Sequence, residues 1–215
     1  MILKSFSKIN LSLSVNRKLK NRKLHEIQSY FCLINLFDQI KIKRIKDRKD
    51  IVKFKGKFAQ YIKEKKNSIT DTLTILRERN LISNYYSVLV NKKIPVFGGM
   101  GGGTSNAVCL IKHLTKNKIN NNLLSILNKK IGSDIQLFFD EQGFLKNLTT
   151  INYFRRKYKL YFLLVYPNVR CSTRYVYSKV KKFTSKSKYS FKKINNKSTF
   201  TALPINKKND LQSIV

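Results

Sequence analysis

The first feature that could carry chemistry is a glycine-rich stretch, Pro95 to Ala107, with the sequence Pro-Val-Phe-Gly-Gly-Met-Gly-Gly-Gly-Thr-Ser-Asn-Ala. The chain contains only 8 Gly, and five of them fall between positions 98 and 103. Glycine allows positive φ and the close approach of a ligand to the backbone. The next three residues, Thr104-Ser105-Asn106, favour helix N-caps. A glycine loop that leads into a helix N-terminus predicts an anion site, where backbone N–H groups and the helix dipole meet a phosphate.

A carboxylate follows this loop after a predicted helix end. Asp134 is one of 11 acidic residues in the chain, and it opens a short apolar segment that ends at Phe139. Partial desolvation raises the basicity of a carboxylate. Asp134 is therefore a candidate general base for a substrate hydroxyl. Taken alone, the same position is also that of a helix N-cap.

The elements before the loop read mainly as strands. Residues 8–15 alternate between apolar and polar, which predicts a half-buried strand with Lys8 and Asn10 on its polar face. Residues 25–45 predict further strand with a bend at 37–39, and residues 85–90 a short strand that enters the loop. A helix is expected from Asn67 or Ser68 to about Arg79.

After the loop the pattern becomes helical. Apolar residues at 107, 110, 111 and 114 have the spacing of an amphipathic helix, and a second helix is expected over 121–131. Residues 160–166 predict a buried strand, residues 172–180 a helix, and residues 181–198 a basic loop or disordered arm. The chain therefore reads as an α+β protein, with one domain over residues 1–150 and a shorter part over 151–215.

The charge is strongly basic, with 45 Lys and Arg against 11 Asp and Glu, a formal net charge of +34. One interpretation is a nucleic-acid or other polyanion partner. The other is biased codon usage, because Lys is spread along the whole chain and accompanied by abundant Ile and Asn. The second is favoured here, since a nucleic-acid binder more often confines its charge to one face or tail. No specific nucleic-acid partner is expected.

The cysteines, histidines and apolar segments exclude several classes of protein and of metal site. The three Cys are odd in number and widely spaced, which argues against a disulfide framework. The two His, His25 and His113, cannot form a Cys/His metal cluster at this spacing. No apolar run approaches the ~20 residues of a membrane span, and the N-terminus lacks the apolar core of a signal peptide. A cytoplasmic protein without a membrane partner is expected, with no metal-ligating residues; the oligomeric state stays open.

The loop lacks the Gly-Lys-Ser/Thr ending of a P-loop and the acid and βαβ context of a Rossmann fingerprint. It closely resembles the phosphate loop of the GHMP kinase superfamily, Pro-x-x-x-Gly-Leu-Gly-Gly-Gly-Ser-Ser-Asn/Asp-Ala, with Met100 in place of Leu and Thr104 in place of the first Ser. Further segments resemble the superfamily in the same order. They are Ser7–Leu11, Leu24–Gln28, Lys92–Pro95, Ile131–Ile135, Tyr166-Pro167 with Ser172-Thr173 and Tyr177, and Asn209–Leu211.

The resemblance implies a GHMP kinase-like fold, with a ribosomal protein S5 domain 2-like N-terminal ATP-binding domain over residues 1–150. Residues 151–215 would be an incomplete C-terminal α/β substrate domain. It implies a small-molecule kinase that uses ATP and Mg²⁺. The triple glycine points to the members that phosphorylate the 2-hydroxyl of 4-(cytidine 5'-diphospho)-2-C-methyl-D-erythritol, in non-mevalonate isoprenoid precursor biosynthesis.

The resemblance also implies the site residues. Asp134 would be the base, and Lys8 would stabilise charge developing on the transferred phosphoryl group. ATP would bind Pro95, Val96, Phe97, Gly98, Gly99, Met100, Gly101, Gly102, Gly103, Thr104 and Ser105. The cytidine substrate would contact Asn10, His25, Thr173 and Tyr177, with His25 at the cytosine edge.

Two departures from the superfamily pattern shape these expectations. Leu24 stands where an aromatic residue usually stacks on cytosine, so it offers apolar contact without a π-stack. The chain ends at Val215, whereas the superfamily continues. The expected alternatives to an active kinase are therefore an inactive truncated remnant of one, or a basic nucleic-acid-binding protein.

Overall fold

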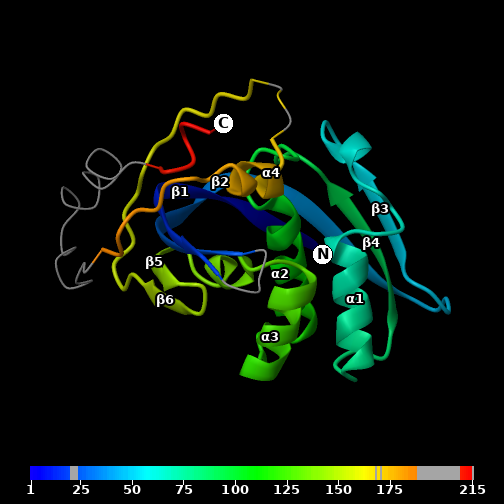
Figure 1. Cartoon of the computed structure of the whole chain (residues 1–215). Helices are drawn as coiled ribbons and strands as arrows, with labels where there is room; N and C mark the ends of the chain where they lie inside the picture. Colours follow the sequence, from blue (N-terminus) through cyan, green and yellow to red (C-terminus); the bar gives the residue numbers. More distant parts are fainter. Residues whose placement is uncertain (20–23, 168, 170, 188–208, 215) are drawn as a thin grey trace. The chain divides into compact units, whose positions relative to one another are not determined.

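The computed structural model describes residues 1–19, 24–167, 169, 171–187 and 209–214 (Figure 1). The chain separates into two compact units, each built from several stretches of sequence. Unit 1 comprises residues 1–8, 34–96 and 100–139, and unit 2 comprises residues 9–33, 97–99 and 140–215. Two long strands, β1 (Ile2–Lys18) and β2 (His25–Ile45), contribute residues to both units.

The remaining elements divide between the units. Unit 1 also contains β3 (Ile51–Lys55), η1 (Ala59–Tyr61), α1 (Ser68–Glu78), β4 (Tyr85–Asn91), α2 (Gly102–Leu114), α3 (Asn121–Lys130) and η2 (Ile135–Phe138). Unit 2 also contains β5 (Gln142–Asn147), β6 (Thr150–Tyr153) and α4 (Thr173–Ser178). This mixture of strands and helices confirms the α+β class. The units interleave in sequence, whereas the sequence suggested a single boundary near residue 150.

In unit 1, the second half of β2 pairs antiparallel with β4, and β3 pairs parallel with β4. The register places Gln39 opposite Asn91 and Ile45 opposite Tyr85. Side chains alternate across this sheet, with Ile40 buried and its neighbour Lys41 exposed. One face of the sheet therefore contributes to the core of unit 1, and the other face carries lysines.

Helices α1 and α2 pack against each other in unit 1. Helix α1 begins as expected, since the side chain of Asn67 accepts hydrogen bonds from the backbone of Ile69 and Thr70 in a capping box. The expected apolar positions of α2 are buried at residues 107, 110 and 111. With 13 residues, α2 is the longest helix among the described residues, and none of those helices could cross a membrane.

The start of α2 differs from the prediction. The residues expected to cap it, Thr104-Ser105-Asn106, lie inside the helix, and the N-cap is Gly101. Gly101 adopts the left-handed conformation with φ 68°, which turns the chain into the helix before any capping side chain is reached. Gly102 and Gly103 then form the first helical residues.

In unit 2, the first half of β2 pairs antiparallel with β5, and β5 pairs antiparallel with β6. The rings of Tyr30 and Phe144 stack with centroids 4.5 Å apart and form part of this unit's core. A glycine is required at position 143 of β5, because a Cβ there would lie 2.9 Å from the carbonyl oxygen of Asn152 and 3.0 Å from the ring of Phe31.

Two other predictions were wrong. The expected bend at 37–39 is continuous strand, since residues 25–45 form one element of 21 residues. The expected buried strand at 160–166 has no regular secondary structure, and its side chains from 161 to 165 are exposed, with Leu163 at 92% and Val165 at 82%. Strand propensity needs a neighbouring strand to take effect, and no pairing with a described strand is present. The expected arm at 181–198 lies partly outside the described residues.

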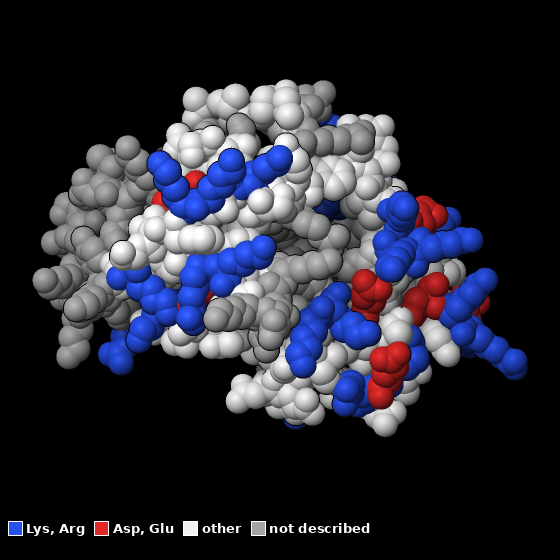
Figure 2. All heavy atoms as spheres, in the orientation of Figure 1, with Lys and Arg blue, Asp and Glu red and all other residues white. Residues whose placement is uncertain are grey.

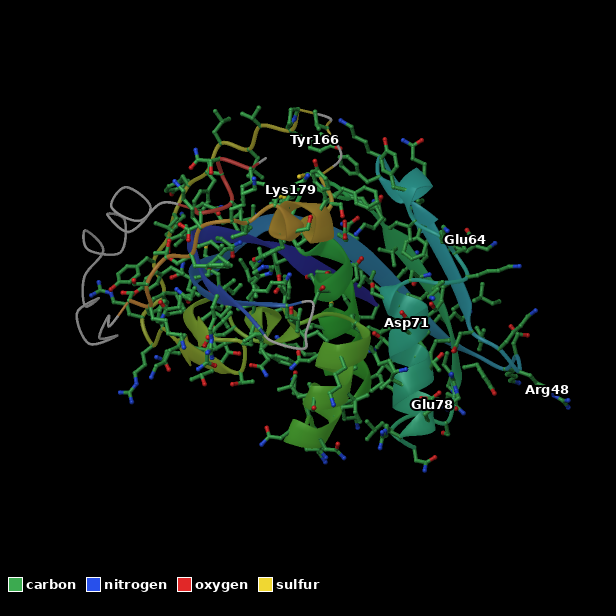
Figure 3. The ribbon with its side chains drawn as sticks, viewed as in Figure 1. Arg48, Glu64, Asp71, Glu78, Tyr166 and Lys179 are labelled. Carbon is green, nitrogen blue, oxygen red and sulfur yellow. The ribbon has the colours of Figure 1, made fainter. Side chains whose placement is uncertain are left out.

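Basic side chains occur on both units, as Figure 2 shows on one face of the molecule. Acidic side chains are fewer. In unit 1 they accompany the basic ones around α1, where Asp71 and Glu78 project from the helix, and Arg48 lies at the turn after β2 (Figure 3). Around α1, basic and acidic side chains are therefore interspersed.

Candidate active site

The glycine-rich loop connects β4 to α2 and ends in an uncapped helix N-terminus. No side chain caps α2 at Gly101. The first N–H groups of a helix have no partner within the helix, and without a capping side chain they can bind an anion. Before the helix, Phe97 and Gly99 also have positive φ, 66° and 68°, and Phe97 is exposed.

Two glycines of the loop are fixed by close packing. A Cβ on Gly101 would lie 2.5 Å from the ring of Phe138, in η2. A Cβ on Gly102 would lie 3.0 Å from Cγ2 of Ile94. At Gly99, by contrast, a Cβ would meet nothing within 4 Å. The glycine cluster therefore serves two purposes, since Gly101 and Gly102 admit neighbouring side chains while Gly99 supplies only a conformation.

The predicted catalytic residues, Lys8 and Asp134, are brought together beside this loop within unit 1. The Lys8 backbone N–H donates to the carbonyl oxygen of Met100 at 3.0 Å. Its ammonium, on a side chain that is 4% exposed, donates to Oδ2 of Asp134 at 3.3 Å. Asp134 directly precedes η2, whose Phe138 packs on Gly101, and its side chain is 39% exposed. A carboxylate open to solvent next to a buried ammonium can accept a proton while the ammonium meets a phosphate.

The two hydroxyl residues of the expected ATP site differ in their surroundings. Thr104 is half-buried, and its Oγ1 lies 3.4 Å from the Cβ position of Gly132, so it faces the segment that carries Asp134. Ser105 is buried, where its hydroxyl donates to the carbonyl oxygen of Phe6 at 2.6 Å and lies 2.8 Å from Oγ of Ser5. Ser105 therefore anchors α2 to β1. Pro95 and Val96 are half-buried at the start of the loop.

Beneath the loop lies a buried polar cluster that the sequence did not predict. Asp38 and Lys92 form an ion pair, with side chains 0% and 2% exposed. Asn106 donates to Asp38 and accepts from Lys92, each at 3.0 Å. Burial lowers the pKa of Lys92, and the charge and hydrogen bond of Asp38 oppose this. The sequence signal for this cluster was an acidic residue, Asp38, within the segment Leu36–Ile40. The sequence predicted a bend there instead.

The expected substrate residues fall in unit 2. Oδ1 of Asn10 accepts a hydrogen bond from the hydroxyl of Ser29 at 3.1 Å. The rings of His25 and Tyr177 lie 5.3 Å apart, so the structure brings β2 and α4 together at this point. The pKa of His25 is lowered by burial and, to a smaller extent, by the charge of Lys18. Thr173, the first residue of α4, is exposed, and Ser172 caps the helix.

Phe183 is a further aromatic residue at His25. Their ring centroids are 6.3 Å apart in a stacked arrangement, and Phe183 is 46% exposed. Leu24, which stands in the place of the usual aromatic residue, is 40% exposed. Phe183 stands between Lys182 and Thr184 in a basic segment, and no sequence pattern marked it as a candidate binding residue. The backbone bond from Thr184 N–H to the carbonyl oxygen of Val15, at 2.9 Å, holds this segment on β1.

The side chains suit a magnesium ion that arrives with a nucleotide. Among the described residues there is no group of three or more His, Cys, Asp or Glu that could hold a metal ion. Mg²⁺ with ATP commonly uses only one or two protein oxygens, together with phosphate oxygens and water. The exposed carboxylate of Asp134 and the hydroxyl of Thr104 are oxygen donors of that type within unit 1.

Curated relatives resemble the chain over most of its length, and each is described as a 4-diphosphocytidyl-2-C-methyl-D-erythritol kinase. That of Pelagibacter ubique is 36% identical over 187 residues, covering 85% of this chain and 66% of the relative. That of Ureaplasma parvum is 32% identical over 194 residues, covering 83% and 69%. That of Buchnera aphidicola is 32% identical over 198 residues, covering 86% and 66%. The chain thus spans about two thirds of the length of these relatives.

Solved structures agree in fold. A crystal structure of 4-(cytidine 5'-diphospho)-2C-methyl-D-erythritol kinase matches with a TM-score of 0.64 at 20% identity, covering 99% of this chain and 76% of that one. The mevalonate kinase of Methanococcus jannaschii matches with a TM-score of 0.51 at 15% identity, covering 73% and 56%. The GHMP kinase fold expected from the sequence is therefore confirmed.

No protein-family model matches the chain. The identity to the Ureaplasma relative, maintained over 69% of that relative's length, is sufficient by itself to assign the family. The chain belongs to the 4-diphosphocytidyl-2-C-methyl-D-erythritol kinase family.

Proposed function

We propose that the chain transfers the γ-phosphoryl group of ATP to the 2-hydroxyl of 4-(cytidine 5'-diphospho)-2-C-methyl-D-erythritol. The observation that carries the proposal is the contact of Lys8 with both Asp134 and the glycine-rich loop. Phosphoryl transfer demands positioning and charge stabilisation more than covalent chemistry from the protein. A base and a cation next to an anion-binding loop meet that demand.

The nucleotide phosphates would bind residues 95–105. The uncapped N-terminus of α2 offers backbone N–H groups and the positive end of the helix dipole. Gly101 and Gly102 let the start of the helix pack closely on Phe138 and Ile94, which holds these N–H groups in place. Mg²⁺ bound with ATP would neutralise charge on the phosphates, and the oxygens of Thr104 and Asp134 would be the protein groups available to hold it.

In the transfer step, the substrate 2-hydroxyl loses its proton to the carboxylate of Asp134 as its oxygen bonds to the γ-phosphorus. The bond between that phosphorus and the β,γ-bridging oxygen breaks, and ADP leaves. Lys8 stabilises the negative charge on the phosphoryl oxygens. Its ammonium, 3.3 Å from Oδ2 of Asp134, also holds that carboxylate beside the loop, where it would accept the proton.

The cytidine substrate would bind through unit 2. Because burial lowers the pKa of His25, its imidazole is neutral at neutral pH and can both donate and accept a hydrogen bond at the cytosine edge. Tyr177 supplies an aromatic face beside it, and Phe183 a second one. Asn10 and Thr173 supply polar contacts to the remainder of the substrate.

The product would serve non-mevalonate isoprenoid precursor biosynthesis. We also propose that the protein binds ATP and the cytidine diphosphate substrate, and that it is located in the cytoplasm. Nucleic-acid binding remains the rival function, and it rests on the charge of +34 alone. That charge does not account for Lys8 and Asp134 meeting at a glycine-rich loop.

The direct test is ADP formation from ATP and Mg²⁺ in the presence and absence of the cytidine substrate. The proposal expects ADP only when both are present, from protein that is folded by circular dichroism. ATP binding without substrate-dependent ADP would favour the inactive remnant. Tight binding to a defined RNA at physiological salt, without ATP binding, would favour the nucleic-acid function.

A further inference from the structure

One buried carboxylate is bonded to both flanks of the glycine-rich loop. Oδ1 of Asp38 accepts hydrogen bonds from the backbone of Lys93 at 2.7 Å and Ile94 at 2.9 Å, immediately before the loop. Oδ2 accepts from Nδ2 of Asn106 at 3.0 Å, in α2 after the loop. The same oxygen forms the buried ion pair with Lys92. Asp38 thus connects the residue before Pro95 with the helix that the loop enters.

The cluster also reaches the strand that carries the catalytic lysine. Nδ2 of Asn106 donates to Oγ of Ser5 at 2.9 Å, and that hydroxyl lies 2.8 Å from Oγ of Ser105. Ser5 and Lys8 both belong to β1. The loop, α2 and β1 are therefore joined by side chains that are at most 4% exposed.

The position of Lys92 explains why a carboxylate is needed here. Its ammonium lies 3.3 Å from the Cβ position of Gly102, next to the first turn of α2. The N-terminus of a helix repels a cation. A buried ion pair adds little stability compared with apolar residues of similar volume, but the loss of one partner leaves an uncompensated charge. Without Asp38, a buried ammonium would lie against the positive end of α2.

We propose that Asp38 is a positioning residue for nucleotide binding. Its four bonds hold the glycine-rich loop and the first turn of α2 in one arrangement, so that the N–H groups which bind phosphate are oriented before ATP arrives. Preorganised donors bind more tightly because less freedom is lost on binding. The identity of the anion as ATP rests on the proposed function, whereas the ordering of the loop does not.

Asp38→Asn tests this proposal against the matched control Asp50→Asn. Asp50 belongs to the same unit, forms an ion pair with Arg77 at 2.9 Å and accepts a backbone hydrogen bond from Tyr86 at 2.8 Å, but it is not bonded to the loop. We expect Asp38→Asn to speed amide hydrogen exchange over residues 93–106 about tenfold or more in the protein without nucleotide. Asp50→Asn should speed exchange near residue 86 and leave residues 93–106 unchanged.

A double variant separates positioning from stability. Asp38→Ala with Lys92→Met removes both buried charges, so its unfolding temperature should exceed that of Asp38→Asn. The proposal expects exchange over residues 93–106 to remain fast, and the affinity for ATP–Mg²⁺ to remain about tenfold or more below that of the parent protein. Affinity for the cytidine substrate should not change.

Recovery of slow loop exchange together with stability in the double variant would overturn the proposal, as would equal loop exchange in Asp38→Asn and Asp50→Asn. If the parent protein binds no ATP, the proposed function fails, but the exchange comparison still decides the role of Asp38. If Asp38→Asn does not fold, the double variant and Asp50→Asn provide the same comparison.

Discussion

Unit 1, which contains most of the proposed nucleotide site, and unit 2, which contains the proposed substrate residues, are built differently. In unit 1, the residues around the glycine-rich loop are joined by buried polar bonds, with Asp38 and Lys92 almost completely covered. In unit 2, large apolar side chains are exposed, including Tyr161 at 81% and Leu163 at 92%. The glycine-rich loop, the proposed phosphate site, is thus held by buried bonds from a residue distant in the sequence. The proposed contacts to the cytidine lie on more open surfaces, namely the rings at His25.

The largest effect on the phosphoryl-transfer rate is expected from a substitution at Asp134. Asp134→Asn removes the proton acceptor but keeps the shape of the side chain, so the transfer rate should fall about 10²- to 10⁴-fold. Affinity for ATP in the absence of Mg²⁺ should change little, because phosphate binding is assigned to the loop. Single-turnover kinetics and calorimetric titration measure the two quantities.

Asp140→Asn is the matched control for that prediction, since Asp140 is also half-exposed and pairs with Lys157 in unit 2. It should leave the transfer rate within about twofold of the parent, as expected for an exposed ion pair. Equal losses in the two variants would remove Asp134 from the catalytic role.

The next largest effect is expected when Gly101 and Gly99 of the loop are each replaced by Ala. Ala at position 101 must adopt φ 68° and also meets the ring of Phe138, so Gly101→Ala should cost roughly 2–4 kcal/mol of stability. Ala at position 99 has the same φ but open space, so Gly99→Ala should cost about 1 kcal/mol. Chemical denaturation of both variants provides the measurement, and Gly101→Ala should also weaken ATP binding the more.

If Gly99→Ala proved as costly as Gly101→Ala, the conformation alone would explain the glycines. The packing of Phe138 on Gly101 would then have no part in ordering the loop. If both substitutions were neutral, the left-handed conformation would not be required at either position.

On the substrate side, smaller effects are expected from the rings at His25. Tyr177→Leu and Phe183→Leu each remove one aromatic face, so the affinity for the cytidine substrate should fall by the equivalent of about 0.5–1.5 kcal/mol. Tyr175→Leu is the control, because Tyr175 lies on the same helix and is 58% exposed. Titration with the substrate in the absence of ATP measures all three.

A loss at Tyr177 without one at Phe183 would restrict recognition to the residue expected from the sequence. The opposite result would show that Phe183 supplies the aromatic face that Leu24 lacks. A loss at Tyr175 as large as either would indicate a general effect on α4.

The smallest effect concerns the stability of unit 2. Glu26 pairs with Lys186 at 2.7 Å and Arg17 at 2.6 Å, and these bonds lower its pKa despite the opposing effect of burial. A carboxylate with a lowered pKa adds stability that is present above its unfolded pKa and lost as the pH falls through its folded pKa. Glu26→Gln should therefore unfold at a temperature a few degrees lower than the parent at pH 7.

That difference should disappear in acid, below the lowered pKa of Glu26. Thermal unfolding between pH 3 and 7 provides the check. A difference of equal size at both ends of this range would show that Glu26 contributes by packing alone.

The sequence predicted the elements of unit 1 better than those of unit 2, for physical reasons. The capping residue Asn67 and the apolar spacing of α2 are local signals, and both elements formed as expected. Contacts between distant residues were predicted only where the family resemblance supplied them, as for Lys8 and Asp134.

Signals that depend on tertiary surroundings were interpreted wrongly or missed. A bend was predicted at Asp38 because a charged residue inside a strand is unusual. Its partners, Lys92 and Asn106, are distant in sequence, so the buried cluster was missed. Residues 160–166 have the composition of a strand but no pairing among the described residues. Phe183 has no periodic pattern around it, so only its three-dimensional contact with His25 reveals it.

The most direct test of the central claim is the ³¹P nuclear magnetic resonance spectrum of the product formed from ATP, Mg²⁺ and the cytidine substrate. We expect a new phosphomonoester signal on the 2-position of the methylerythritol, appearing together with ADP and absent with Asp134→Asn. Unchanged ATP and substrate after prolonged incubation with folded protein would contradict it, as would inorganic phosphate as the sole new signal.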